Sequence, residues 1–194
     1  MRVFHSQPYV DIPQAAGTCY SGWPAIGQAL QEHVEALGKN RAIIAVECHP
    51  GTYGQIGMRA LGEALQPSFS CLTSDLFLEE KELRAKIGKR FPFAKPGIDS
   101  LEQYFDPDKL AAFRPLVQAC KTGAILIYGP GAALLEKADL TVYADISHWE
   151  LLQRLKRREI GNLGVKNSRA SLAYRYAWSY LLDWEIGCRI KKRC

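Results

Sequence analysis

The chain has 194 residues, of which 47% are hydrophobic and 23% are charged, and its formal net charge is +5. These proportions are typical of a globular protein and exclude a disordered, collagen-like or disulfide-scaffold chain. No stretch approaches the ~18 consecutive apolar residues of a membrane span, and we find no signal-peptide core at the N-terminus. We therefore expect a cytoplasmic protein that does not bind membranes. The modest positive charge favours anionic partners.

The cysteines and histidines show no metal-binding or redox spacing. No C-x-x-C pair occurs among the six cysteines, and no H-x-H or H-E-x-x-H spacing occurs among the four histidines. We therefore expect no metal site, and we expect the cysteines to be buried free thiols rather than disulfide partners. The cysteines are Cys19, Cys48, Cys71, Cys120, Cys188 and Cys194.

Apolar spacing and Pro/Gly breaks predict the elements of the first half of the chain. Residues 1–24, rich in Pro, Gly and Ser, are expected to form an irregular lead-in. Helical spacing predicts a helix over 25–37, and the apolar run 42–46 predicts a buried strand over 41–47. The elements expected next are a helix over 56–65, a short strand over 68–73, a charged helix over 76–90 and a loop over 91–97.

The second half continues the alternation of helices and apolar strands. The expected elements are strands over 124–128 and 140–145, helices over 110–119 and 148–158, and a helical C-terminal segment over 168–194. Pro115 must kink or begin the first of these helices. Continuously apolar strands separated by helices predict an α/β architecture with a mainly parallel sheet. Right-handed crossovers place helices on both faces, so we expect a three-layer single domain over residues 1–194.

A glycine-bearing turn follows the first predicted strand and reads Glu47-Cys48-His49-Pro50-Gly51-Thr52-Tyr53-Gly54-Gln55-Ile56. In a parallel sheet, ligands bind where strand carboxyl ends meet helix N-termini, whose amides attract anions. A phosphate loop of the G-x-x-x-x-G-K-[ST] type needs a lysine and a hydroxyl where Gln55 and Ile56 stand. The turn therefore predicts a plain tight turn, an anion site formed by Gly51, Thr52, Gly54 and Gln55, or a divergent nucleotide site.

The predicted helix over 148–158 bears Arg154, Arg157 and Arg158. Its apolar face is predicted from the helical spacing of Trp149, Leu152 and Leu155. Arginine forks suit phosphate, so the arginines are either a lid over an anionic ligand or a solvated basic face. In the second interpretation they pair with Glu150 and Glu159.

Two aspartates, Asp75 and Asp145, lie at predicted strand ends. Asp75 would act as a base or a hydroxyl anchor in a kinase, or it would cap a helix. Asp145 precedes a predicted helix, which Asp145 or Ser147 is placed to cap. The aromatic residues over 174–184 have no basic stripe among them, so they predict helix packing and no nucleic-acid partner.

Several segments resemble, in chain order, the motifs of uridine-kinase-like P-loop kinases. They are Ile43-Ile44-Ala45-Val46 through Met58-Arg59-Ala60-Leu61 (first strand, loop and helix), Ser74-Asp75-Leu76-Phe77 (the segment whose aspartate contacts the acceptor hydroxyl), Tyr104-Phe105-Asp106-Pro107-Asp108-Lys109-Leu110 (the FDP-type segment), Ile125-Leu126-Ile127-Tyr128-Gly129 (a strand ending in Glu-Gly) and residues 139–145 with 154–158 (last strand and lid helix). Tyr128 stands in place of the acidic residue of that Glu-Gly strand. The resemblance implies a kinase-like core over 41–165 with a degenerate phosphate loop, and ATP with Mg²⁺ where catalysis is retained.

A second resemblance concerns the later part of the chain. Its motifs are Tyr128-Gly129-Pro130-Gly131-Ala132-Ala133-Leu134, His148-Trp149-Glu150, Arg157-Arg158-Glu159-Ile160-Gly161-Asn162-Leu163-Gly164 and Asp183-Trp184-Glu185. They resemble a kinase-like region joined N-terminally to some bacterial class I mannose-6-phosphate isomerases. In that family the isomerase is a separate zinc cupin domain, whose H-x-H-type region has no counterpart in this sequence. The chain then corresponds to the companion domain alone or to a truncated form, and we expect no sugar isomerisation by it.

These observations support three hypotheses about function. The first is a degenerate kinase-like domain that binds a phosphate-bearing ligand, or that supports an isomerase domain or a homo-oligomer, without efficient phosphoryl transfer. It follows from the missing lysine and hydroxyl, because phosphoryl transfer depends on positioning and charge neutralisation. The second is an active nucleoside or sugar kinase with a divergent phosphate loop. The third is a structural or oligomerising module.

Overall fold

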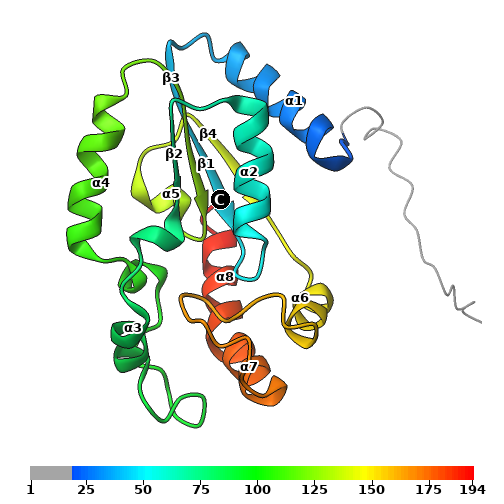
Figure 1. The fold of residues 1–194 in the computed structure, drawn as a ribbon, viewed down its shortest axis with the longest axis vertical. Coiled ribbons are helices and arrows are strands. Elements are labelled where there is room, and N and C mark those ends of the chain that lie inside the picture. Colours follow the sequence, from blue (N-terminus) through cyan, green and yellow to red (C-terminus); the bar gives the residue numbers. More distant parts are fainter. Residues whose placement is uncertain (1–18) are drawn as a thin grey trace, which may run out of the picture.

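Four parallel strands form the centre of the computed structural model, which describes residues 19–194 (Figure 1). The strands lie in the order β2-β3-β1-β4. Their bounds are Arg41–Cys48 for β1, Phe69–Leu72 for β2, Gly123–Gly129 for β3 and Leu140–Ala144 for β4. Because β1 pairs with β3 on one edge and with β4 on the other, seven of its eight residues are buried. This burial explains why residues 42–46 form one continuous apolar run.

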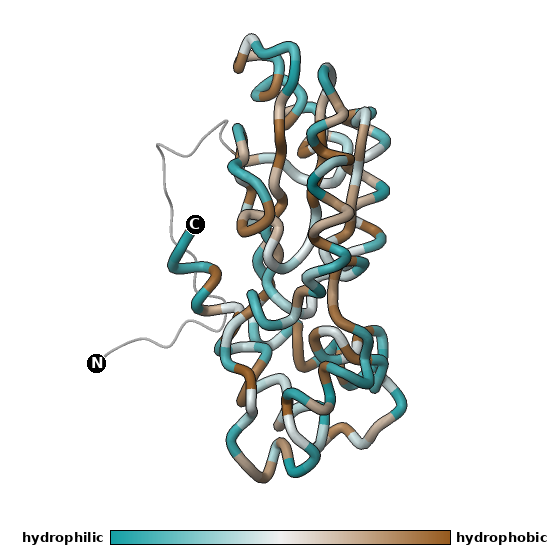
Figure 2. The backbone as a smooth tube through the Cα atoms, turned by 90° about the vertical axis from the view of Figure 1, so that its left-hand side faces the viewer, coloured by the Kyte–Doolittle hydropathy of each residue, from teal (hydrophilic) through white to brown (hydrophobic). Residues whose placement is uncertain are grey.

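Helices precede, connect and follow the strands of the described chain. The α-helices are α1 Gly22–Ala36, α2 Gly54–Leu65, α3 Glu80–Ile87, α4 Pro107–Ala119, α5 Ala132–Leu135, α6 His148–Lys156, α7 Leu172–Trp178 and α8 Trp184–Lys191. A π-helical turn, Ser179–Asp183, joins α7 to α8. Figure 2 shows hydrophilic and hydrophobic residues alternating along the helical turns, as expected for helices that cover a sheet with one side.

Alternate side chains of β1 point to the two faces of the sheet. Ile44 and Val46 belong to the cluster that packs under α1 and α2, where Leu61 is buried. Ile43 and Ala45 belong to the cluster formed with α3, α4 and α5. Figure 1 shows α2 and α4 on opposite sides of the strands. The structure therefore confirms the predicted α/β arrangement of a parallel sheet with helices on both faces.

The C-terminal helices belong to the same core. Four of their side chains join the cluster that contains Ile43: Trp178, Leu182, Ile186 and Ile190. Each of these four is at most 5% exposed. A side chain at Gly187 would collide with the ring of His49, directly after β1, so α8 approaches the sheet as closely as glycine allows. The helical segment predicted over 168–194 therefore packs into the same hydrophobic cluster as the sheet.

The predicted helix over 76–90 is wrong at both ends. α3 spans only Glu80–Ile87, and a 3-10 turn occupies Thr73–Leu76. Between them the backbone bonds to a distant segment, since the N–H of Leu78 donates to the carbonyl of Tyr104 at 2.8 Å. This tertiary bond holds the chain outside a helix, and local apolar spacing contains no signal for it.

Other predicted boundaries differ less from the structure. Pro115 lies inside α4, which begins at Pro107, so Pro115 does not begin the helix. α1 begins at Gly22, three residues before its predicted start, so the last residues of the lead-in predicted over 1–24 are helical. Residues 1–18 of that lead-in lie outside the described part of the chain.

The cysteines differ in exposure, and each is free. Only Cys48 is buried, whereas Cys19 and Cys194 are exposed and the other three are half-buried. The expectation of buried thiols is therefore wrong for most of them. Across residues 19–194, no helix combines the length and the apolar character needed to cross a membrane.

Candidate functional site

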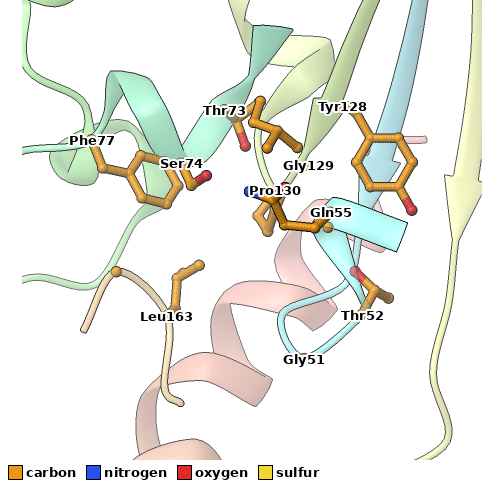
Figure 3. A pocket seen from close by; sticks show the side chains of 13 residues that line it. Gly51, Thr52, Gln55, Thr73, Ser74, Phe77, Tyr128, Gly129, Pro130 and Leu163 are labelled. Carbon is orange, nitrogen blue, oxygen red and sulfur yellow. The ribbon is translucent and has the colours of Figure 1, made fainter. Parts of the chain in front are cut away.

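The chain leaves the carboxyl ends of two neighbouring strands toward opposite faces of the sheet. After β1 it turns through residues 49–53 into α2, and after β3 it turns through Pro130 and Gly131 into α5. α2 packs on one face and α5 on the other. In open parallel sheets, ligands bind in the crevice at such a switch point. A cavity of about 240 Å³ opens there (Figure 3).

Segments far apart in the sequence form the walls of this cavity, which we call the strand-end cavity. Its lining residues are Gly51, Thr52, Gly54 and Gln55 of the glycine turn, Leu72 to Ser74 and Phe77 at and after the end of β2, Tyr128 to Pro130 at and after the end of β3, and Leu163 and Gly164. The four residues predicted to form an anion site on the turn therefore lie together. Within the described chain, no charged side chain lines this cavity.

Two glycines allow the close contacts that shape the strand-end cavity. Gly51 has a φ of 97°, and a side chain there would collide with Leu151 of α6. Gly129 has a φ of 127°, and a side chain there would collide with the hydroxyl of Thr73. Glycine is required at both positions, because it adopts a positive φ without strain and has no Cβ that would collide with the neighbouring side chain.

Uncapped donors face the strand-end cavity. Tyr53, the residue before α2, makes no side-chain capping bond, so the first amides of α2 keep their partial positive charge. Thr73 is completely buried, and its hydroxyl has no hydrogen-bond partner. Figure 3 shows that hydroxyl pointing toward Gly129 and Pro130 at the wall of the cavity. A buried polar group without a partner costs about 1–3 kcal/mol, which a bound ligand or water relieves.

The three predicted arginines do not line the strand-end cavity. Arg154 bonds to Glu150 at 2.9 Å, and Arg157 bonds to Glu150 at 3.2 Å and to Glu159 at 2.7 Å. Arg158 is exposed beyond the end of α6. Of the two interpretations of this helix, the structure shows the basic face that is paired with Glu150 and Glu159.

The arginine helix is nevertheless fastened to the glycine turn. Nη1 of Arg154 donates to the carbonyl of Gly51 at 3.0 Å, and its guanidinium carbon lies 3.8 Å from the centroid of the Tyr53 ring. The Tyr53 hydroxyl donates to Glu159 at 2.5 Å. Bonds from Arg157 and then from Tyr53 lower the pKa of Glu159 to about 2. α6 therefore fixes the shape of the turn through groups that are already paired.

The predicted apolar face of α6 is wrong at Trp149. The side chain of Trp149 is 70% exposed. It lies in the first turn of α6, which begins at His148, and it is not buried against the core. The side chains of α6 that are buried are Leu151 and Leu155. Ser147 caps the helix as predicted, since its hydroxyl accepts from the N–H of Glu150 at 3.1 Å.

Asp75 lies beside the strand-end cavity rather than in it. It is exposed on the 3-10 turn after β2, and it lines an adjoining cavity of about 600 Å³ with Lys109 and Asn162. The two cavities share three lining residues, Ser74, Phe77 and Gly164. Asp75 caps no α-helix, because α3 begins five residues later. The structure thus places Asp75 next to the predicted anion site without contact to it.

Glu47 is a structural residue of the site that the sequence reasoning missed. It ends the apolar run of β1 and is 1% exposed. Its carboxylate accepts from the N–H groups of Gly131 at 2.5 Å and Ala133 at 3.0 Å, so it ties the end of β1 to the turn after β3. Burial raises the pKa of Glu47. An acidic residue closing an otherwise apolar strand is the signal that marks it.

A buried amide and carboxyl fix the wall opposite the glycine turn. Nδ2 of Asn162 donates to Asp183 at 2.7 Å, and the N–H of Leu163 donates to the same oxygen at 3.3 Å. Burial raises the pKa of Asp183 to about 7. Asp183 lies in the π-helical turn between α7 and α8, and such turns often occur at functional sites. No local sequence pattern connects it with residue 162.

A family model described as a domain of unknown function (DUF8485) matches residues 22–194. The chain belongs to this family. No curated protein and no solved structure matches it. The matched region includes every residue that lines the strand-end cavity of this DUF8485 domain.

The strand-end cavity of the DUF8485 domain is lined by neutral groups. The strand-end cavity offers backbone amides, hydroxyls and the amide of Gln55, which are neutral donors. Among residues 19–194, no group of three or more His, Cys, Asp or Glu side chains is placed to hold a metal ion. The site can therefore hold an anion through hydrogen bonds and the dipole of α2.

Proposed function

We propose that this DUF8485 domain binds a phosphate-bearing small molecule in the strand-end cavity and transfers phosphoryl groups inefficiently or not at all. The observation that supports this most is the meeting of two uncommitted donors at one switch point. These are the uncapped N-terminus of α2 and the partnerless hydroxyl of Thr73. Both are suited to phosphate oxygens, which accept several hydrogen bonds at once.

The absence of efficient transfer follows from charge. Phosphoryl transfer requires cations that neutralise the developing charge on the phosphate oxygens. Gln55 occupies the position of the phosphate-loop lysine, and Arg154 and Arg157 are engaged by Glu150 and Glu159. A ligand bound by neutral donors alone is held but not activated.

From the resemblance to the kinase-like region of mannose-6-phosphate isomerases, we further propose a supporting role for an isomerase domain in the cytoplasm. The substrate of such a partner carries a phosphate, which agrees with the ligand proposed for the strand-end cavity. Assembly with that domain or with further copies of this chain is part of the same proposal.

A second candidate function is an active nucleoside or sugar kinase. The observation that favours it is Asp75, which lines a roomy cavity directly beside the proposed phosphate site. A carboxylate so placed would accept a proton from an acceptor hydroxyl. ATP and Mg²⁺ would then be required.

Thermal unfolding with added ligands tests both functions. The ligands are inorganic phosphate, mannose 6-phosphate, uridine and ATP, each with and without Mg²⁺. At about 100 times its dissociation constant, a ligand stabilises the fold by about 2.7 kcal/mol. We expect stabilisation by phosphate or mannose 6-phosphate without Mg²⁺. Phosphorylation of uridine or a sugar by ATP would instead establish the kinase, and no stabilisation by any ligand would contradict both proposals.

Two pairs of variants locate the site. Thr73→Val removes the partnerless hydroxyl at nearly constant volume and should weaken phosphate binding, while Thr141→Val on the exposed side of β4 should not. Gln55→Glu places a negative charge at the N-terminus of α2 and should abolish binding, while Gln118→Glu on exposed α4 should not. Equal effects within either pair would contradict binding at this cavity.

A further inference from the structure

A cavity of about 360 Å³ lies between α3 and α7, and it shares no lining residue with the strand-end cavity. We call it the α3–α7 cavity. It exists because Ala85 and Gly88, three positions apart along the α3 side, are too small to fill the space toward α7. Its volume falls within the range of about 300–1,000 Å³ that is usual for small-molecule sites.

Aromatic rings form the inner wall of the α3–α7 cavity. Trp178 is 2% exposed and lines the cavity together with Tyr174. The two rings meet edge to face, with centroids 5.8 Å apart. The guanidinium carbon of Arg84 lies 5.7 Å from the centroid of the Trp178 ring. The two ring planes are inclined by 63°, so the wall is an angled aromatic surface against which the ring of a ligand can pack.

Cations form the rim of the same cavity. Lys81, Arg84 and Lys89 line it, and no acidic residue does so within the described chain. Glu80 neutralises Arg84 at 2.8 Å, whereas Lys81 and Lys89 make no ion pair among residues 19–194. Two uncompensated positive charges therefore border an aromatic wall. An anion bound at this rim is attracted by both lysines.

We propose that the α3–α7 cavity binds a small aromatic anion. Its ring lies against Tyr174 and Trp178, and its carboxylate, sulfonate or phosphate group lies between Lys81 and Lys89. Ring and charge both contribute to binding, because aromatic side chains form the wall and cationic side chains form the rim. This site is separate from the phosphate site proposed above and does not depend on it.

Calorimetric titration of the full chain with naphthalene-1-sulfonate tests the proposal. The matched probes are neutral naphthalene-1-methanol, which lacks the charge, and ethanesulfonate, which lacks the ring. We expect the aromatic sulfonate to bind at least about tenfold more tightly than either. Comparable affinity for all three probes, or no binding of the aromatic sulfonate at millimolar concentration, would overturn the proposal.

Paired variants separate the cavity from the general charge of the surface. The double variant Lys81→Gln with Lys89→Gln should weaken binding of naphthalene-1-sulfonate about tenfold. Lys86→Gln with Lys95→Gln removes the same charge from exposed positions that do not line the cavity, and should leave binding unchanged. All four lysines are exposed, so both proteins should fold, which their melting temperatures check. Equal weakening by the two double variants would overturn the proposal.

A third variant keeps this site distinct from the strand-end cavity. Thr73→Val, which tests the phosphate site, should leave the affinity for naphthalene-1-sulfonate unchanged. A loss of sulfonate binding in Thr73→Val would show that the probe occupies the strand-end cavity and would overturn the assignment to α3 and α7. Loss of phosphate binding alone would leave it intact.

Discussion

The guanidinium carbon of Arg154 lies 3.8 Å from the centroid of the Tyr53 ring, and Nη1 of the same arginine bonds to the carbonyl of Gly51. One side chain of α6 thus holds two residues of the glycine turn. The kinase resemblance implies that such an arginine closes over a ligand. In this fold it supports the glycine turn instead, so under the proposed function α6 would affect ligand affinity through the shape of that turn.

Replacing Arg154 with lysine should lower the free energy of unfolding by about 1–2 kcal/mol, because an ammonium group cannot stack and bond in a fork at the same time. Urea denaturation measures this. Arg158→Lys, at an exposed position, serves as the control and should change stability by less than about 0.5 kcal/mol. Unchanged stability of Arg154→Lys together with weaker phosphate binding would mean that Arg154 contacts the ligand directly.

The contribution of Asp183 to stability should fall as pH rises from about 4 to about 7. Burial raises the pKa of Asp183 from 3.8 to about 7, so the folded state holds a proton that the unfolded state has lost in this interval. Each unit of difference is worth about 1.4 kcal/mol, and the loss is complete above the folded-state pKa. Asp183→Asn should remove this part of the pH dependence.

The measurement is urea denaturation at several pH values for the wild type and two variants. The exposed carboxyl of Asp75 supplies the control, and Asp75→Asn should keep the wild-type slope. If Asp183→Asn also keeps it, the carboxyl of Asp183 is ionised in the folded state throughout, and the prediction fails.

Glu47→Gln should lower the free energy of unfolding by about 2–3 kcal/mol. The amide that replaces one carboxylate oxygen would place its hydrogens against a backbone N–H of Gly131 or Ala133. Glu63→Gln, in an exposed ion pair on α2, should have almost no effect. Thermal unfolding of the two variants decides this, and similar melting temperatures would refute it.

Alanine substitutions at two glycines should have opposite signs. Gly51→Ala should destabilise the fold by about 2 kcal/mol or more, since its φ of 97° is strained for alanine and its Cβ would collide with Leu151. Gly62→Ala, inside α2 with open space around it, should stabilise it by up to about 1 kcal/mol. Destabilisation by both variants would contradict the role given to Gly51.

How much of the fold could be predicted depends on how local its causes are. The strands were predictable because burial on both faces makes runs such as 42–46 continuously apolar. The helix predicted over 76–90 failed because its first residues bond to a segment near Tyr104. Of the two alternatives for Pro115, the start of α4 is excluded, because the helix begins eight residues earlier at Pro107.

The same distinction applies to the site. Gly51, Thr52, Gly54 and Gln55 were found together because they follow one another on a single turn. Thr73 lines the strand-end cavity because β2 pairs with β3. This pairing joins distant segments, so it cannot be predicted from a local sequence pattern. The pairing of Arg154 with Glu150 can be predicted from the sequence, because the two residues lie one helical turn apart.

The late position of α8 in the chain has a consequence during synthesis. The last strand is complete at Ala144, but Ile186 and Ile190, which cover the face containing Ile43, are translated about 45 residues later. At about 5–20 residues per second, that interval lasts roughly 2–9 s. Until α8 is made, the face containing Ile43 lacks the part of its apolar cover that Ile186 and Ile190 supply. Chaperone demand in the cell should therefore depend on how fast codons 145 to 190 are read.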